Sequence, residues 1–205
     1  MKITGKIIVF ASACLFAWNL TAWAAMPFSD DFESYTNQTP LINGLNGWYA
    51  SDVTCIAQTN ISYTNYGGNK SAQIPIDVTL SNRFTGNAFT SVWVRFYSRA
   101  VFFDGQTNVD TGIAQPVVGT NLSAMFFINT AGYFVVHNGP FDPDPTNSTK
   151  WVTLTNTPVT AGSWTRVDVL LDYPTTNWTI YVGGSIMTNN IGFIDTSIKI
   201  GRAHV

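Results

Sequence analysis

The chain is poor in the residues from which catalytic and metal-binding sites are usually built. Its 205 residues include only two cysteines, two histidines and one glutamate, Glu33. No combination of them has the spacing of a zinc site, and no glycine-rich loop matches a phosphate-binding motif. Lysine and arginine together number ten and form no basic stripe, so we expect neither nucleic acid nor an anionic membrane surface as a partner.

The first 24 residues predict an export signal. Lys2 and Lys6 precede a mostly apolar stretch at residues 7–20, and residues 22–24, A-W-A, have the form of a cleavage site. Polar residues interrupt the stretch before it reaches the roughly 20 apolar residues that a membrane span needs. We therefore predict cleavage after this motif and a secreted or cell-surface protein with no membrane span. A lipid anchor on Cys14 is the alternative, although the apolar stretch continues past that residue.

Residues 25–199 are predicted to form one exported domain, which is long enough to bury a hydrophobic core. Four arginines and three lysines stand against eleven aspartates and one glutamate in this range, so its net charge is −5. Cys55 is its only cysteine, which excludes an intrachain disulfide. Because Cys55 alternates with Val53 and Ala57, we interpret it as a small core residue.

The last six residues, 200–205, read Ile-Gly-Arg-Ala-His-Val. This hexapeptide resembles the translation of a sequencing-adapter oligonucleotide, and we interpret it as a non-native tail. We expect the natural chain to continue beyond Lys199 with at least one more strand. On that expectation, the segment from Phe28 to Phe32 borders a sheet edge that lacks its partner.

Short runs of period-2 alternation, separated by Gly, Asn and Pro, dominate the rest of the sequence and predict β-strands. No helical periodicity of useful length is present. Residues 129–132 and 173–177 have the composition of hairpin turns. The fold class predicted from this pattern is all-β, an antiparallel sandwich or barrel. The clearest predicted strands are 53–58, 90–103, 123–129, 132–138, 151–155, 163–173, 177–184 and 185–189.

Two neighbouring segments carry a family resemblance. The pattern W-x-R-V-x-V-x-L-D-Y at 164–173 is followed, after a turn, by W-x-I-Y-V-G-G at 178–184. This pair resembles the late strands of concanavalin-A-like lectin/glucanase domains, the laminin-G-like jelly rolls, and residues 28–36, 44–50 and 89–97 resemble their earlier segments. The resemblance implies an antiparallel β-sandwich of the jelly-roll type, here expected to lack its last strand or strands. Gly183 departs from the usual Asn or Asp, but it suits a tight turn.

The glucanases of this fold use an E-x-D-x-x-E motif, which a chain with one glutamate cannot contain. Asp168 and Asp172 share a strand face but lie about 13 Å apart. Glycoside cleavage needs two carboxyl groups roughly 5–9.5 Å apart. Asp142 and Asp144 have workable spacing, but they lie in a proline-rich loop with nothing to raise the pKa of either one. We therefore expect no catalytic residues.

The resemblance also implies a possible structural calcium ion, because jelly-roll modules often hold one with carboxylate and carbonyl oxygens. Asp30, Asp31 and Glu33 form one candidate cluster, and Asp142 and Asp144 form another. Neither cluster alone supplies the 6–8 oxygen ligands that calcium takes. An ordinary charged strand and a rigid proline-spaced turn are therefore the favoured interpretations of the two clusters.

Alternation in the strand at 91–99 suggests a ligand-binding face. Val92, Val94 and Phe96 lie on one side, and the other side carries a candidate site of flat aromatic rings beside hydrogen-bond donors, which suits sugars. The competing interpretation, that the rings pack beneath a covering loop, is favoured by the general tendency of large apolar residues to be buried. The candidate ligand-binding residues are Trp93, Arg95, Tyr97, Arg99 and, on another strand, His137.

His137 alternates with Tyr133 and Val135, and we interpret it as a surface or rim residue because no nucleophile accompanies it. Arg166 and Asp168 are expected to pair across strands in an exposed contact of little energetic value. The function predicted from the sequence is a secreted, non-catalytic binding module for a polysaccharide or surface glycan. A structural or adhesive protein without a small ligand is the first alternative, and an enzyme with an unrecognised site is the second.

Overall fold

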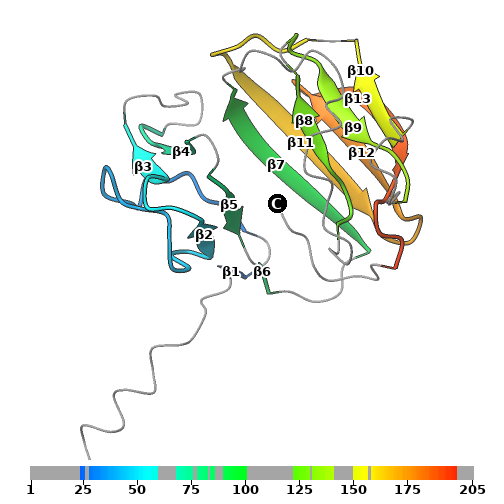
Figure 1. Ribbon diagram of the computed structural model, residues 1–205. Coiled ribbons are helices and arrows are strands. Elements are labelled where there is room, and N and C mark those ends of the chain that lie inside the picture. Colours follow the sequence, from blue (N-terminus) through cyan, green and yellow to red (C-terminus); the bar gives the residue numbers. More distant parts are fainter. Residues whose placement is uncertain are drawn as a thin grey trace, which may run out of the picture. The chain divides into compact units, whose positions relative to one another are not determined.

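The described part of the chain consists of β-strands joined by turns, as the computed structural model in Figure 1 shows. The structure describes residues 28–59, 68–75, 78–82, 90–100, 122–129, 131–140, 150–156 and 158–197, together with the backbone of 24–25 and 84–85. These residues form no helix that is long and apolar enough to cross a bilayer. The described residues up to Thr85 form one compact unit, and those from Thr90 onward form a second.

The second unit is an antiparallel β-sandwich. Its larger sheet has four strands in the order β13-β12-β11-β7, and its smaller sheet has three in the order β10-β9-β8. All pairings are antiparallel. The strands of the larger sheet are β7 (Ser91–Arg99), β11 (Trp164–Asp172), β12 (Asn177–Val182) and β13 (Ser185–Gly192), and those of the smaller sheet are β8 (Phe126–Ile128), β9 (Phe134–His137) and β10 (Trp151–Leu154).

Apolar side chains from the facing sides of the two sheets form the core of the sandwich. Phe126 of the smaller sheet packs its ring on Phe96 of β7 and on Trp178 of β12, with centroid separations of 6.3 and 6.1 Å. Val92, Val94 and Phe96 pack against this core as the alternation predicts, so the two sides of β7 are confirmed. The fully or nearly buried members include Phe134, Val136, Val167, Val169, Leu171, Trp178, Ile180, Val182 and Phe193.

The turns that join these strands follow the predicted chemistry. In the 129–132 hairpin, the Asn129 side-chain oxygen accepts hydrogen bonds from the backbone of Ala131 and Tyr133 at 3.1 and 2.9 Å. Gly183 and Gly184 both have positive φ, 60° and 87°, and form the two-residue link between β12 and β13. Two successive positive φ angles match the twist of an antiparallel hairpin, so this turn sets the pairing of Val182 with Ser185 and of Tyr181 with Ile186, and the register shifts further along the strands.

The first unit contains short strand pairs and its own small core. β2 (Trp48–Ala50) pairs with β5 (Leu80–Asn82), and β3 (Ile56–Gln58) pairs with β4 (Ser71–Gln73), both antiparallel. β1 (Ala24–Ala25) pairs in parallel with β6 (Phe84–Thr85). The buried residues Tyr35, Leu41, Cys55 and Ala57 form the core of this unit.

Cys55 is confirmed as a core residue, but the strand predicted at 53–58 is too long. The strand begins at Ile56, because the Asp52 carboxylate accepts hydrogen bonds from the Thr54 amide and hydroxyl at 2.8 and 2.7 Å and holds the preceding residues in a turn. Val53 is accordingly 58 % exposed. The burial of Cys55 therefore comes from its position in the small core rather than from alternation with Val53.

The expectation of a sheet edge at Phe28 to Phe32 is wrong, because no strand forms there. Asp30 accepts a hydrogen bond from the Phe32 amide at 2.8 Å, and Phe32 has a φ of 63°, which is uncommon for a bulky residue. These two features turn the backbone at a place where the prediction required an extended segment beside a sheet edge.

Candidate functional site

The outward side of the four-stranded sheet, which we call the outer face, carries the predicted ligand-binding residues of β7. Trp93, Arg95, Tyr97 and Arg99 stand opposite Leu170, Asp168, Arg166 and Trp164 of β11. On β12, Tyr181 lies opposite Asp168, and on β13, Ile186 lies opposite Tyr181. Tyr181 and Ile186 were not among the predicted ligand-binding residues, although the two-glycine turn after Val182 could have placed them opposite each other.

The side chains of Trp93, Tyr181 and Ile186 cross the outer face as a stripe, which we call the apolar stripe. Trp93 is 56 % exposed and Ile186 is 51 % exposed. The rings of Trp93 and Tyr181 are in contact, with centroids 5.5 Å apart and planes inclined at 40°. Burial of Trp93 beneath a covering loop is therefore the wrong interpretation of this residue, because more than half of its surface faces outward.

A buried carboxylate lies beside this stripe. Asp168 is only 2 % exposed, although it belongs to the outer face. Its Oδ1 accepts a hydrogen bond from Nε of Arg95, and its Oδ2 accepts one from Nε of Arg166 at 2.7 Å. The expected exposed pair of Arg166 and Asp168 across strands is wrong on both counts, because the two residues lie on the same strand, β11, and Asp168 is buried. The register adds Arg95 of β7, which lies directly opposite Asp168, and completes a three-residue network.

The network controls the charge of Asp168. Burial by itself raises the pKa of this carboxyl group, but the hydrogen bonds from Arg95 and Arg166, with the charges of the two guanidinium groups, bring the pKa below its ordinary value. Asp168 therefore remains ionised and accepts hydrogen bonds from both sides. It is unsuited to donate a proton in acid catalysis at neutral pH.

The hydrogen bonds to Asp168 leave both arginines accessible at the surface. The Arg95 side chain is 52 % exposed and the Arg166 side chain is 34 % exposed. Because each Nε atom is held by the same carboxylate, the planes of both guanidinium groups have fewer orientations than a solvated arginine. Because the side chains are already oriented, they lose less conformational entropy when a ligand binds.

The other two predicted residues of β7 extend the outer face towards its far end. Tyr97 is partly buried, and Arg99 is exposed opposite Trp164. Gly162 lies close to Arg99, because a Cβ added there would be 3.4 Å from its Nη2 atom. All four predicted residues of β7 therefore share one face, which the alternation predicted.

His137 does not belong to this face, and its assignment as a surface or rim residue is wrong. It lies on β9 in the smaller sheet and is 1 % exposed. Its ring packs edge-to-face on Trp151 with centroids 5.0 Å apart, and its Nδ1 has no hydrogen-bond partner. Burial lowers the pKa of His137, and the nearby charge of Lys150 lowers it further, so the ring is neutral near pH 7.

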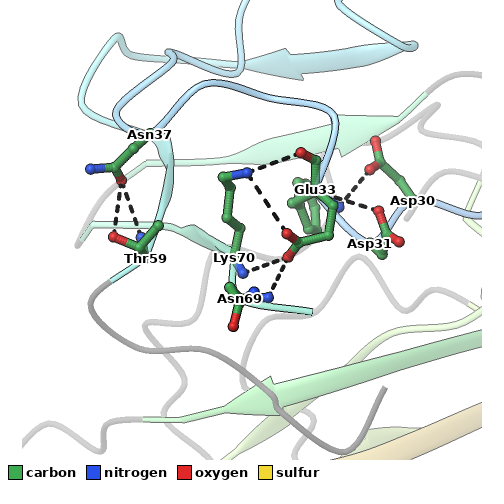
Figure 2. A network of polar contacts seen from close by, with 8 residues as sticks. Asp30, Asp31, Glu33, Asn37, Thr59, Asn69 and Lys70 are labelled. Atoms are coloured by element: carbon green, nitrogen blue, oxygen red, sulfur yellow. Dashed lines mark hydrogen bonds and ion pairs between the residues drawn. The ribbon is translucent and has the colours of Figure 1, made fainter. Parts of the chain in front are cut away.

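The predicted calcium cluster in the first unit separates into individual hydrogen-bonding roles, which Figure 2 shows in part. The Asp30 carboxylate accepts hydrogen bonds from the Phe32 amide, the Tyr35 hydroxyl at 2.6 Å and the indole N–H of Trp48 at 2.8 Å. Asp31 accepts a hydrogen bond from the Glu33 amide at 3.0 Å. The oxygens of Asp30 are thus occupied by donors of the protein.

Glu33 makes its own contacts with the start of β4 (Figure 2). Its Oε1 accepts hydrogen bonds from the amides of Asn69 and Lys70 at 2.5 and 2.7 Å, and its Oε2 lies 3.7 Å from Lys70 Nζ. Within the described ranges, no group of three or more His, Cys, Asp or Glu residues could hold a metal ion. Asp142 and Asp144 lie outside the described residues, so calcium at that loop stays a prediction.

Comparison with protein families finds no match, and comparison with curated proteins finds none either. Among solved structures, the chain is similar to one titled "Sialidase", with a TM-score of 0.52 and 17 % sequence identity. The likeness covers 84 % of this chain but only 14 % of that one. At this identity the similarity bears on the fold alone, and it agrees with the antiparallel β-sandwich described above.

Proposed function

We propose that this chain is a secreted, non-catalytic module that binds a glycan on the outer face of β7, β11 and β12. The observation that carries the proposal is the exposed Trp93 ring, held against Tyr181 beside two arginines that one carboxylate orients. The C–H face of a sugar stacks on such a ring, and its hydroxyl groups accept hydrogen bonds from neighbouring guanidinium groups.

Two further observations support the proposal. The segments 164–173 and 178–184, which resemble concanavalin-A-like jelly rolls, form the β11–β12 hairpin at the centre of the outer face. The similar structure titled "Sialidase" carries a name that refers to glycan chemistry. The A-W-A motif at 22–24 supports export, which would place the module among extracellular or cell-surface polysaccharides.

The proposed absence of catalysis rests on the state of the carboxylates. Asp168, the carboxylate at the centre of the outer face, is ionised and bonded to both arginines. The E-x-D-x-x-E motif of the glucanases that these segments resemble is absent from the sequence. Binding without cleavage is therefore the function that suits this face best.

A glycan array followed by titration of intrinsic tryptophan fluorescence tests the proposal. A bound sugar should change the fluorescence of the parent protein, and Trp93→Ala should weaken binding by at least about tenfold. Val152→Ala is the matched control, because Val152 is 40 % exposed on β10 of the other sheet. Both variants should unfold at nearly the temperature of the parent protein, since neither residue is buried.

The alternative function is a structural or adhesive protein with no small ligand. The exposed Trp93 and Ile186 would then contact another protein through the apolar stripe. Absence of glycan binding across the array, together with an unchanged fluorescence spectrum, would favour this alternative and contradict the proposal.

A further inference from the structure

The arginines of the predicted exported domain are concentrated on the outer face. Residues 25–199 contain four arginines, and three of them, Arg95, Arg99 and Arg166, lie on this side of β7 and β11. The same range has a net charge of −5, so the distribution runs against the charge of the chain as a whole. A local excess of positive charge on an acidic protein indicates an anionic partner.

The described carboxylates of this face do not cancel that excess of charge. Asp168 is buried and already bonded to two guanidinium groups. Asp172 is four residues further along β11, about 13 Å from Asp168 at the usual rise of a strand. Among the described residues, the outer face therefore carries three guanidinium groups, one buried carboxylate near its centre and one distant carboxylate at the end of β11.

The charged arginine side chains lie beside the apolar stripe. Arg95 follows Trp93 by two residues on the same side of β7, a separation of about 7 Å along the strand. Arg95 and Arg166 lie on adjacent strands, whose axes are about 4.8 Å apart, and Asp168 fixes both side chains. One sugar stacked on Trp93 therefore brings an acidic substituent, or that of the next sugar, within reach of these arginines.

Guanidinium chemistry defines the substituent. The guanidinium group has five N–H donors, and Nε of Arg166 uses only one of them on Asp168. The planar array of donors matches the paired oxygens of carboxylate and sulfate groups, and such charge-assisted hydrogen bonds are stronger than those to neutral hydroxyl groups. From the stripe and the arginines together, we propose that the outer face binds acidic glycans, which carry carboxylate or sulfate groups. This inference rests on the glycan-binding function proposed above.

Matched oligosaccharides separate charge from sugar recognition. We suggest calorimetric titration of the full chain with trigalacturonate, with its fully methyl-esterified form and with sulfated and unsulfated dextran oligomers. We expect trigalacturonate to bind at least about tenfold more tightly than its ester, with an affinity that falls as salt rises. A stronger response to sulfated dextran than to trigalacturonate would assign the site to sulfate rather than carboxylate.

Two variants locate the interaction. Arg166→Gln should weaken trigalacturonate binding by about tenfold and the binding of neutral oligomers by clearly less, because glutamine retains an N–H donor for hydroxyl groups but lacks the charge. Lys150→Gln is the control, because it removes the same charge beside β10 of the other sheet. Equal losses in the two variants would show that the net charge of the protein, and not the outer face, attracts the ligand, and would overturn the proposal.

The remaining outcomes distinguish this inference from the function on which it rests. Equal affinity for the acid and its ester, with Trp93→Ala abolishing both, would overturn the acidic specificity but retain glycan binding. No binding of any charged or neutral oligomer, with unchanged tryptophan fluorescence, would overturn both. In each variant, a cooperative thermal transition well above the temperature of the titration would verify that the sandwich remains folded.

Discussion

Trp93 and Tyr181 touch although β11 lies between their strands. In the sheet order β13-β12-β11-β7, Trp93 stands opposite Leu170 and Tyr181 stands opposite Asp168, so the two rings meet diagonally over β11 at a centroid separation of 5.5 Å. This contact joins three strands on the outward side of the sheet. It also lies beside Asp168, whose 2 % exposure is unusual for an acidic residue on the outward side of a sheet.

The Asp168 network gives a prediction for stability in acid. The folded-state pKa of Asp168 lies below its ordinary value of 3.8, so the stabilising effect is complete above that value and is lost as pH falls through the folded-state pKa. Asp168→Asn should lower the free energy of unfolding at pH 7 by about 1–3 kcal/mol, because two guanidinium groups lose a charged acceptor. Urea titrations from pH 7 to pH 3 measure this, and the difference in stability between parent and variant should become smaller at the acid end. Parallel curves across this range would contradict the assignment.

His137 predicts a pH dependence in a different window. Its folded-state pKa is below the ordinary 6.5, so below that value the unfolded chain takes up a proton that the buried ring does not. Its contribution to stability is therefore complete above pH 6.5 and declines as pH falls. His137→Phe, which preserves the ring packed on Trp151, should reduce the loss of stability between pH 7.5 and 5.5. Urea unfolding at the two pH values measures this loss of stability in the parent and in the variant. Equal losses would show that the ring of His137 is solvated in the folded protein.

Two glycines provide a matched test of backbone strain and of steric contact. Both have positive φ, but a Cβ on Gly132 would lie 2.3 Å from the Val159 carbonyl oxygen, whereas a Cβ on Gly183 would meet nothing within 4 Å. Gly183→Ala should therefore cost only the strain, about 1–2 kcal/mol. Gly132→Ala should cost clearly more, because backbone must move. Thermal unfolding compares the two, and equal losses would show that the 129–132 hairpin relaxes freely around the added methyl group.

Cys55 should resist alkylation in the native protein. Burial raises the pKa of its thiol, and the side chain is 0 % exposed in the small core of the first unit. The thiolate fraction and the access of reagent are therefore both low. Iodoacetamide at pH 8 should modify Cys55 quickly in urea and slowly without it, as measured by peptide mass spectrometry, and Cys55→Ala identifies any label on Cys14. Rapid native labelling would mean that the small core opens readily.

Alternation in the sequence predicted the two sides of β7 correctly, because a strand directs successive side chains to opposite faces whatever surrounds it. It did not predict what covers each face. His137 and Val135 lie on the side of β9 turned away from the sandwich core, yet they are 1 % and 0 % exposed. The apolar Val135 two residues away was the available signal that this side is covered, and the polar identity of His137 concealed it.

Hydrogen-bond partners that are distant in sequence could not be predicted either. The carboxylate of Asp30 is occupied by Trp48, 18 residues away, as well as by Tyr35. A count of nearby oxygens suggested a cation at this point, but nothing local indicates that an indole and a phenol donate to the same carboxylate. Likewise, the burial of Asp168 depends on the β7–β11 pairing, which is invisible until both strands are placed.

The Arg95–Asp168 contact has a consequence for the newly made chain, because 73 residues separate its two members. At about 5–20 residues per second, β11 emerges from the ribosome roughly 4–15 s after β7. During that interval Val92, Val94 and Phe96 have no larger sheet to join, and such strands tend to associate with other chains. Arg95 and Arg99 interrupt this aromatic and aliphatic run with charge, as residues that oppose aggregation do. The arginines of the proposed ligand-binding face are thus also placed to oppose aggregation of β7 before β11 has been synthesised.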